Sequence, residues 1–254
     1  MDSDLKDKVI ENLLNQVDEL KNPAKKMLVK KTFKLSYFGI PALGEPIRLT
    51  FALGGIPFED DRVTGAEWGK RKASTPYGQM PVLTVTSSDG SSIQMSQARA
   101  ILRFLGKTTT YEGKPLYPTD PLLAYKCDEV MDLIEDIRSP FIKTFAIQDN
   151  AEKEAARHAL VVEGGKMFEL FGKLEARLGG TWVNGESLSI ADIYVTTVLA
   201  DYEQPTFLDG FPADTYKNFP NILKLRQMVT SLPPIVQHYK DEDKNGIRST
   251  LQAE

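Results

Sequence analysis

The sequence predicts a small α/β domain followed by an all-helical domain. Strand-like and helix-like segments alternate over residues 31–107, and residues 108–120 have the composition of a linker. Residues 121–254 have helical periodicity almost throughout, which predicts a helical bundle. The 254 residues are enough for one large or two small domains, each with an adequate core.

The composition is that of a globular protein, with 26% charged and 41% hydrophobic residues. A net charge of −4 predicts no affinity for nucleic acid or for an anionic membrane. The single cysteine, Cys127, excludes an internal disulfide, a paired-cysteine redox site and a cysteine zinc site. No apolar run reaches the length of a membrane span, and the N-terminus is too acidic for a signal peptide. We therefore expect a cytoplasmic protein.

Residues 1–30 are expected to form a separate helical extension. Its apolar residues at helical spacing are Leu5, Val9, Leu13, Val17 and Leu20. Pro23 ends the helix, because proline disfavours helical backbone in the residue before it. Two roles remain open for this extension: a solvated segment docked lightly on the body, or a helix that binds a partner or targets the protein.

The α/β domain begins with a strand, a helix and a second strand. The aromatic, nearly alternating segment 32–38 predicts the first strand. Glu45-Pro46 predicts the start of a helix, with proline in its first turn, and Gly54-Gly55 predicts its end. Residues 58–63 predict the second strand.

A hairpin and a further helix complete this domain. The predicted hairpin has strands at 82–85 and 91–95, joined through an Asp-Gly turn. Ser96 is expected to be the N-cap of the helix that follows. The order strand–helix–strand, then strand–strand–helix, is that of a thioredoxin-like domain.

The second domain is predicted to contain long helices. The first is expected over 122–147, kinked at Pro140, and a second ends at Gly179-Gly180. A third begins at Ser189, which opens a sequence of the capping-box type. A fourth covers 222–229 and is expected to be ended by the two prolines that follow it.

Several candidate site residues also have ordinary structural explanations when each is taken alone. Tyr37 lies near the end of the first strand, where α/β domains bind ligands, but a strand tyrosine usually belongs to the core. Ser96 either caps a helix or helps to bind an anion at its N-terminus. Trp68 and Lys72, four residues apart, share one helical face that is either solvated or part of a binding site.

Acidic residues and histidines give weaker indications. Asp132, Glu135 and Asp136 form either a solvated acidic face or a site for an amine or a divalent metal. His158 and His238 belong to no convergent motif, and the sequence assigns neither of them a role.

Taken together, these segments form an ordered set that spans residues 31–240. Its members are Lys34–Phe38, Glu45–Arg48, Trp68 with Lys72, Pro76–Leu83, Ser96, Asp132–Asp136, Ser189–Tyr194 and Phe219–Pro233. In order and spacing, the set resembles the cytosolic glutathione transferases. It is most similar to their Sigma class, which includes the haematopoietic prostaglandin D synthases.

The resemblance implies a tyrosine-type enzyme with glutathione as co-substrate and no required metal. Tyr37 is then the residue whose hydroxyl hydrogen-bonds the glutathione sulfur. Met80 precedes the family's cis proline, Pro81, and would pair its backbone with the cysteine of the tripeptide. A thiol of pKa about 8.5 is roughly 3% thiolate at pH 7. Lowering that pKa by about two units would therefore raise the thiolate fraction roughly 25-fold.

The resemblance also assigns the two ends of glutathione. Trp68 and Lys72 match positions that hold the glycine end, with Gln79 close by. Ser96 matches the position that binds the γ-glutamyl carboxylate at a helix N-terminus. Asp136 matches an acidic position that reaches the glutathione of the other subunit, which implies a homodimer.

Two residues depart from the family pattern. Met95 stands where the family commonly has Gln or Glu, so one contact to the γ-glutamyl group is expected to be absent. Leu43 stands where some members have an arginine and others a leucine. The 30-residue extension is absent from the mammalian pattern.

The leading interpretation is a detoxification enzyme that conjugates glutathione to small hydrophobic electrophiles. Narrower versions are a glutathione-dependent prostaglandin isomerase or a peroxidase. The alternative is a non-catalytic relative, such as a crystallin or an interaction module of the same fold. A glutaredoxin-like thiol transferase would need a cysteine near position 37, and Cys127 lies far along the chain.

Overall fold

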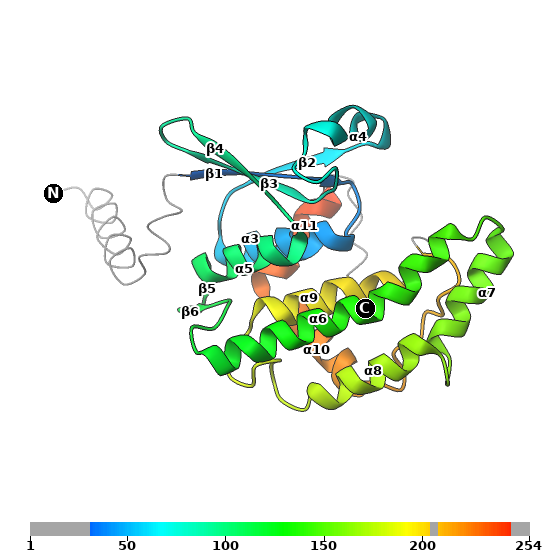
Figure 1. Cartoon of the computed structure of the whole chain (residues 1–254). Helices are drawn as coiled ribbons and strands as arrows, with labels where there is room; N and C mark the ends of the chain where they lie inside the picture. The colour runs from blue at the N-terminus through cyan, green and yellow to red at the C-terminus, as the bar shows by residue number, and fades with distance from the viewer. Residues whose placement is uncertain (1–30, 204–207, 245–254) are drawn as a thin grey trace.

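The computed structural model describes residues 31–203 and 208–244 (Figure 1). An α/β unit with a four-stranded sheet lies over a group of helices, which confirms the predicted fold class. The predicted N-terminal extension lies outside the described residues. None of the helices in the described ranges has the length and apolar character needed to cross a bilayer.

The sheet has the order β2–β1–β3–β4. Its strands are β1 (Lys31–Phe38), β2 (Glu59–Val63), β3 (Val82–Ser87) and β4 (Ser92–Ser96). β1 and β2 are parallel, and the other two pairings are antiparallel. Every second residue of β1 is buried, ending with Tyr37, so this tyrosine lies on the core face of the sheet.

Helices cover the sheet on the side that faces the helical domain. α3 (Glu45–Gly54) forms the crossover between β1 and β2, which parallel strands require. α5 (Ala98–Thr108) follows β4 and packs beside α3. α11 (Pro233–Lys244) comes from the C-terminal end of the described chain and also packs on α3 (Figure 1). α4 (Gly65–Arg71) lies next to β2 at the sheet edge.

The helical domain is built around a fully buried helix. Its helices are α6 (Pro121–Lys143), α7 (Asn150–Val161), α8 (Lys166–Arg177), α9 (Ile190–Ala200) and α10 (Pro220–Thr230). Every residue of α9 is buried, and this helix packs against α6, α10 and α3. The predicted capping box at its start is present, with the Ser189 backbone N–H donating to Asp192 at 2.8 Å. α9 therefore joins the two domains.

Three features differ from the sequence prediction. The first long helix, α6, ends at Lys143 and not at residue 147, and a short 3-10 turn follows it. Pro140 lies inside the helix. The fourth helix, α10, ends at Thr230, before the two prolines, as predicted, but a further helix, α11, begins at Pro233, where proline is tolerated in a first turn. The predicted linker contains a two-stranded pairing of β5 (Thr110–Tyr111) with β6 (Lys114–Pro115).

Candidate active site

A pocket of about 470 Å³ lies between the α/β domain and α6. This volume is in the range of pockets that hold small molecules. The α/β domain contributes Phe38, Leu43, Trp68, Gly78, Gln79, Met80, Pro81, Gln97 and Ala98, and α6 contributes Glu135, Arg138 and Ile142. Four of the predicted site residues are therefore brought together: Trp68, Gln79, Met80 and Pro81.

The loop before β3 forms one wall of this pocket. The Met80–Pro81 peptide bond is cis, as the resemblance implied. Gly78 has a φ of +61°, a left-handed conformation that glycine adopts most readily. A Cβ at Gly78 would lie 3.6 Å from Cε of Lys72, so the lysine stem runs beside the loop. Lys72 is exposed and does not line the pocket.

Tyr37 is buried and is not among the residues that line this pocket. Its ring is buried against Gly44, where an added Cβ would approach the ring Cδ1 to 2.4 Å. The Leu43 backbone N–H donates a hydrogen bond to the Tyr37 hydroxyl at 3.2 Å. Burial raises the pKa of Tyr37 above its usual value of 10, while the bond from Leu43 lowers it. Tyr37 therefore keeps its proton at neutral pH and can donate it in a hydrogen bond.

Arg48 holds the loop between β1 and α3, which carries Leu43. The Arg48 guanidinium is completely buried and donates to the carbonyl oxygens of Ile40 at 2.9 Å and Phe38 at 3.1 Å. It also binds both oxygens of Asp60 and pairs with Glu45 at 3.2 Å. The sequence showed Arg48 only as part of a resemblance, because its acidic partner Asp60 lies in β2, a separate element.

The corner between β4 and α5 corrects one prediction. Ser96 is not the N-cap of α5: it is the last residue of β4, and Gln97 is the N-cap, with a φ of +74°. Gln97 and Ala98 line the pocket, whereas Ser96 and Met95 do not. The Ser96 Oγ is buried without a hydrogen-bond partner among the described residues, and Met95 packs against the core. The Gln97 side-chain amide donates to Oε1 of Gln79 at 3.3 Å.

α6 places two charged residues in the pocket. Arg138 binds both carboxylate oxygens of Glu135, at 2.8 and 3.1 Å, and Glu135 also accepts a hydrogen bond from the Tyr194 hydroxyl. The sequence gave no role to Arg138, although its i, i+3 spacing from Glu135 is visible there. Asp136 is exposed and faces away from the pocket of its own chain.

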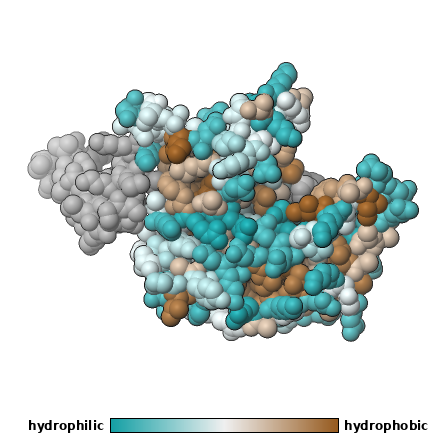
Figure 2. Space-filling model, viewed as in Figure 1, coloured by the Kyte–Doolittle hydropathy of each residue, from teal (hydrophilic) through white to brown (hydrophobic). Residues whose placement is uncertain are grey.

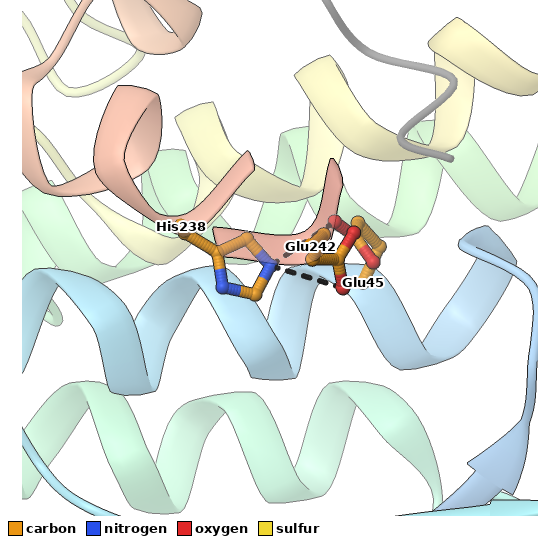
Figure 3. Close-up of side chains that lie close together, drawn as sticks. All are labelled: Glu45, His238 and Glu242. Carbon is orange, nitrogen blue, oxygen red and sulfur yellow. Dashed lines mark ion pairs between the residues drawn. The ribbon is translucent and has the colours of Figure 1, made fainter. Parts of the chain in front are cut away.

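A second cluster of titratable residues joins α11 to α3 (Figure 3). The side chains of Glu45, His238 and Glu242 bring three potential metal ligands within 4.8 Å of one another. His238 Nε2 lies 3.7 Å from Glu45 and 3.5 Å from Glu242. Glu45 also pairs with Arg48, and Glu242 pairs with Arg62. Because these arginines already supply cations to both carboxylates, the cluster is an ion-pair network between the helix and the α/β domain.

Proteins of known family resemble this chain in sequence. Residues 135–242 match the family model described as "Glutathione S-transferase, C-terminal domain". "Glutathione S-transferase 1" of Ascaris suum is 33% identical over 184 residues, which are 70% of this chain and 84% of that protein. "Hematopoietic prostaglandin D synthase" of Gallus gallus is 32% identical over 85% of this chain and 98% of that protein.

A solved structure extends the likeness to the fold. The structure of prostaglandin synthase D of Nilaparvata lugens matches with a TM-score of 0.68 and 31% identity, over 84% of this chain and 97% of that one. Fold and pocket together define a thioredoxin-like protein in which a cis-proline loop and a helix of the helical domain line one pocket. The chain belongs to the glutathione transferase family.

Proposed function

We propose that the protein conjugates glutathione to small hydrophobic electrophiles, with Tyr37 activating the thiol. The observation that supports this proposal most directly is the hydrogen bond from the Leu43 N–H to the Tyr37 hydroxyl. A hydroxyl that accepts from a backbone amide keeps its own proton for a donor bond, and acceptance strengthens that donation. A thiolate beside Tyr37 would be the acceptor.

Glutathione would bind along the wall formed by the loop before β3. The Met80 backbone pairs with the cysteine of the tripeptide, as an extended peptide pairs with a sheet edge. Trp68 holds the glycine end together with Gln79, and Lys72, whose stem lies beside Gly78, supplies a positive charge to the glycine carboxylate.

The γ-glutamyl end would lie at the start of α5. Its carboxylate would meet the free N–H groups at the N-terminus of that helix, which attract anions. We assign the side-chain contact to Gln97, which lines the pocket, in place of Met95. Ala98 has no hydroxyl, and Ser96 does not line the pocket. This end is therefore held mainly by backbone groups and the Gln97 amide.

Tyr37 acts as a hydrogen-bond donor to the sulfur and does not take up the thiol proton. Its pKa is raised above 10, so at pH 7 it is the neutral form that stabilises the thiolate. The thiolate is the nucleophile, and holding it against the electrophile supplies the remainder of the rate enhancement. This chemistry requires no metal.

The assembly belongs to the same proposal. The protein is a homodimer of the Sigma class in which Asp136 reaches the glutathione of the neighbouring subunit. Glutathione-dependent isomerisation of a prostaglandin is the second candidate reaction, favoured by similar proteins that carry the name prostaglandin synthase. Assaying both reactions on one preparation separates the two candidates.

Replacing Tyr37 by phenylalanine tests the proposal. Tyr37→Phe is expected to lower kcat for conjugation of chlorodinitrobenzene by about 10²–10³-fold, the typical effect of removing one donor to a developing anion. Retention on a glutathione column should change little, because the peptide is held by other residues. Tyr111→Phe removes a hydroxyl on β5, outside the pocket, and is the control. Equal turnover of Tyr37→Phe and wild type from pH 6 to 8 would exclude Tyr37 from the mechanism.

A further inference from the structure

Arg138 is the one cation among the residues that line the active-site pocket within the described chain. The lining opposite it on the β1–α3 side is apolar, with Leu43 and Phe38, and Ile142 lies one turn further along α6. The arginine side chain is 16% exposed. At this end of the pocket, a bound molecule would therefore meet apolar side chains and the guanidinium paired with Glu135.

The guanidinium is fixed in place but not saturated. Within the described residues, it donates to the two oxygens of Glu135 and to the Tyr202 hydroxyl. These three contacts leave at least two of the five N–H donors of an arginine. Glu135 is itself held by the Tyr194 hydroxyl, so the acid anchors Arg138 from the protein side.

The surroundings do not repel an anion. Asp201 lies close enough to Arg138 to interact with it electrostatically, but burial raises the pKa of Asp201 to about 8. Asp201 is therefore mostly neutral at pH 7. Glu135 is the acid that lines the pocket beside the guanidinium, and it is already paired with Arg138.

We propose that Arg138 selects electrophiles that carry an apolar body and a carboxylate, which the free N–H donors of Arg138 bind while the body lies against Leu43, Phe38 and Ile142. This inference rests on the proposed conjugation reaction and names its substrate class. A bidentate guanidinium–carboxylate contact has the geometry and strength for such selection.

Ethacrynic acid and its methyl ester form a matched pair of probes, because both carry the same α,β-unsaturated ketone and only the acid carries a remote carboxylate. In each, the thiolate sulfur forms a bond to the β-carbon and the C=C π electrons move to the ketone oxygen. A proton from water then adds to the α-carbon, so the chemical step is the same for both probes. Differences between them report recognition of the carboxylate.

Wild-type enzyme is expected to prefer the acid in kcat/KM after correction for the uncatalysed rates. Arg138→Gln should raise KM for the acid by about 10–100-fold, the usual value of a charged hydrogen bond, and leave KM for the ester within about twofold. Arg138→Lys keeps the charge and should restore part of the preference. Arg103→Gln, which breaks an ion pair with Asp128 outside the pocket, should alter neither substrate.

Equal losses on the acid and the ester would overturn the proposal, because Arg138 would then act on glutathione or on the fold. Unchanged KM for the acid would overturn it as well. Loss of the proposed function gives a different result: neither probe would be conjugated by the wild-type protein. If Arg138→Gln fails to fold, Arg138→Lys remains the deciding variant. A partial loss of the acid preference without loss of ester turnover would support the proposal, and full retention of the preference would count against a bidentate contact.

Discussion

Asp201 connects the helical domain to the loop beside Tyr37. It follows α9 directly, and its carboxyl group accepts a hydrogen bond from the backbone N–H of Ala42, one residue before Leu43. Its Oδ1 is buried without a hydrogen-bond partner among the described residues. Burial is the main reason why the pKa of Asp201 rises to about 8, and the charge of Glu45 adds to it. The folded state therefore prefers the protonated acid.

This preference predicts a pH-dependent effect of Asp201→Asn on stability. Between about pH 4, where an unfolded aspartate titrates, and pH 8, the folded state binds more protons, so the Asp201 contribution becomes less favourable as pH rises. Asparagine keeps the acceptor for Ala42 and cannot ionise. Since one pKa unit is worth about 1.4 kcal/mol, the variant should be more stable than wild type at pH 7 by at least that amount.

Urea unfolding at pH 5, 6, 7 and 8, at one protein concentration, measures this difference. The gain in stability of Asp201→Asn should grow steadily with pH. Asp214→Asn, at an exposed surface ion pair with Lys217, should show no such increase. Parallel pH profiles for wild type and Asp201→Asn would show that the buried carboxyl does not titrate in this range.

At the scale of single residues, local sequence identified part of the site. The Met80–Pro81 loop lines the pocket with its peptide bond cis, as the resemblance implied, whereas the role of Tyr37, which does not line the pocket, stays a prediction. The β4–α5 corner was misplaced by one residue: Ser96 is a strong N-cap type, but it continues the strand by pairing with Val82, and Gln97 makes the turn. A positive φ at glutamine is not visible in a sequence, because few non-glycine residues adopt it.

At the scale of elements, α11 shows how a helix is held by charges from distant segments. In Figure 3, His238 and Glu242 from this helix face Glu45 of α3. Arg48 of α3 and Arg62 of β2 complete the network. The sequence assigned no role to His238, because its acidic partner in α3 lies near the other end of the chain. The two prolines at the start of α11 were likewise interpreted as a stop.

Protonation of His238 is expected to strengthen this docking. Burial and the charge of Arg48 lower the pKa of His238. The hydrogen bond to Glu45 and the charges of Glu45 and Glu242 have a larger effect, so the pKa of His238 is raised above 6.5. The stabilisation is then complete below about pH 6.5, the unfolded pKa, and is lost as pH rises through the folded pKa. His238→Gln should reduce stability by on the order of 1 kcal/mol at pH 6, and by less at pH 8.5.

Thermal unfolding of the two proteins at these two pH values measures the effect. His158→Gln replaces the other histidine of the chain, which is exposed on α7, and is the control. A destabilisation by His238→Gln that is equal at both pH values would mean that the neutral ring contributes only packing. A destabilisation that grows towards pH 8.5 would contradict the sign of the pKa shift.

At the scale of the molecule, the surface around the pocket loop and α6 contains large apolar side chains in water. Tyr77, next to the pocket residue Gly78, is 68% exposed, and Leu122 and Tyr125 on α6 are 74% and 60% exposed. Apolar patches are visible along α6 in Figure 2. Such surface is typical of interfaces between proteins, and Asp136 is exposed on the same helix.

Mixed dimers test whether Asp136 acts across the subunit interface. Asp136→Ala alone should raise KM for glutathione, and Tyr37→Phe alone should abolish most turnover. In a dimer with one subunit of each kind, the site that contains Tyr37 receives Asp136 from the other subunit, so this one site is complete. Such dimers, isolated through two different affinity tags, should show about half of the wild-type kcat and the wild-type KM for glutathione, because a two-fold dimer has two equivalent sites.

Mixed dimers of wild-type and Tyr37→Phe subunits are the reference and should behave in the same way. If Asp136 acted within its own chain, the site with Tyr37 would lack it and the raised KM would persist. Sedimentation of only monomers at micromolar concentration would contradict the dimer itself.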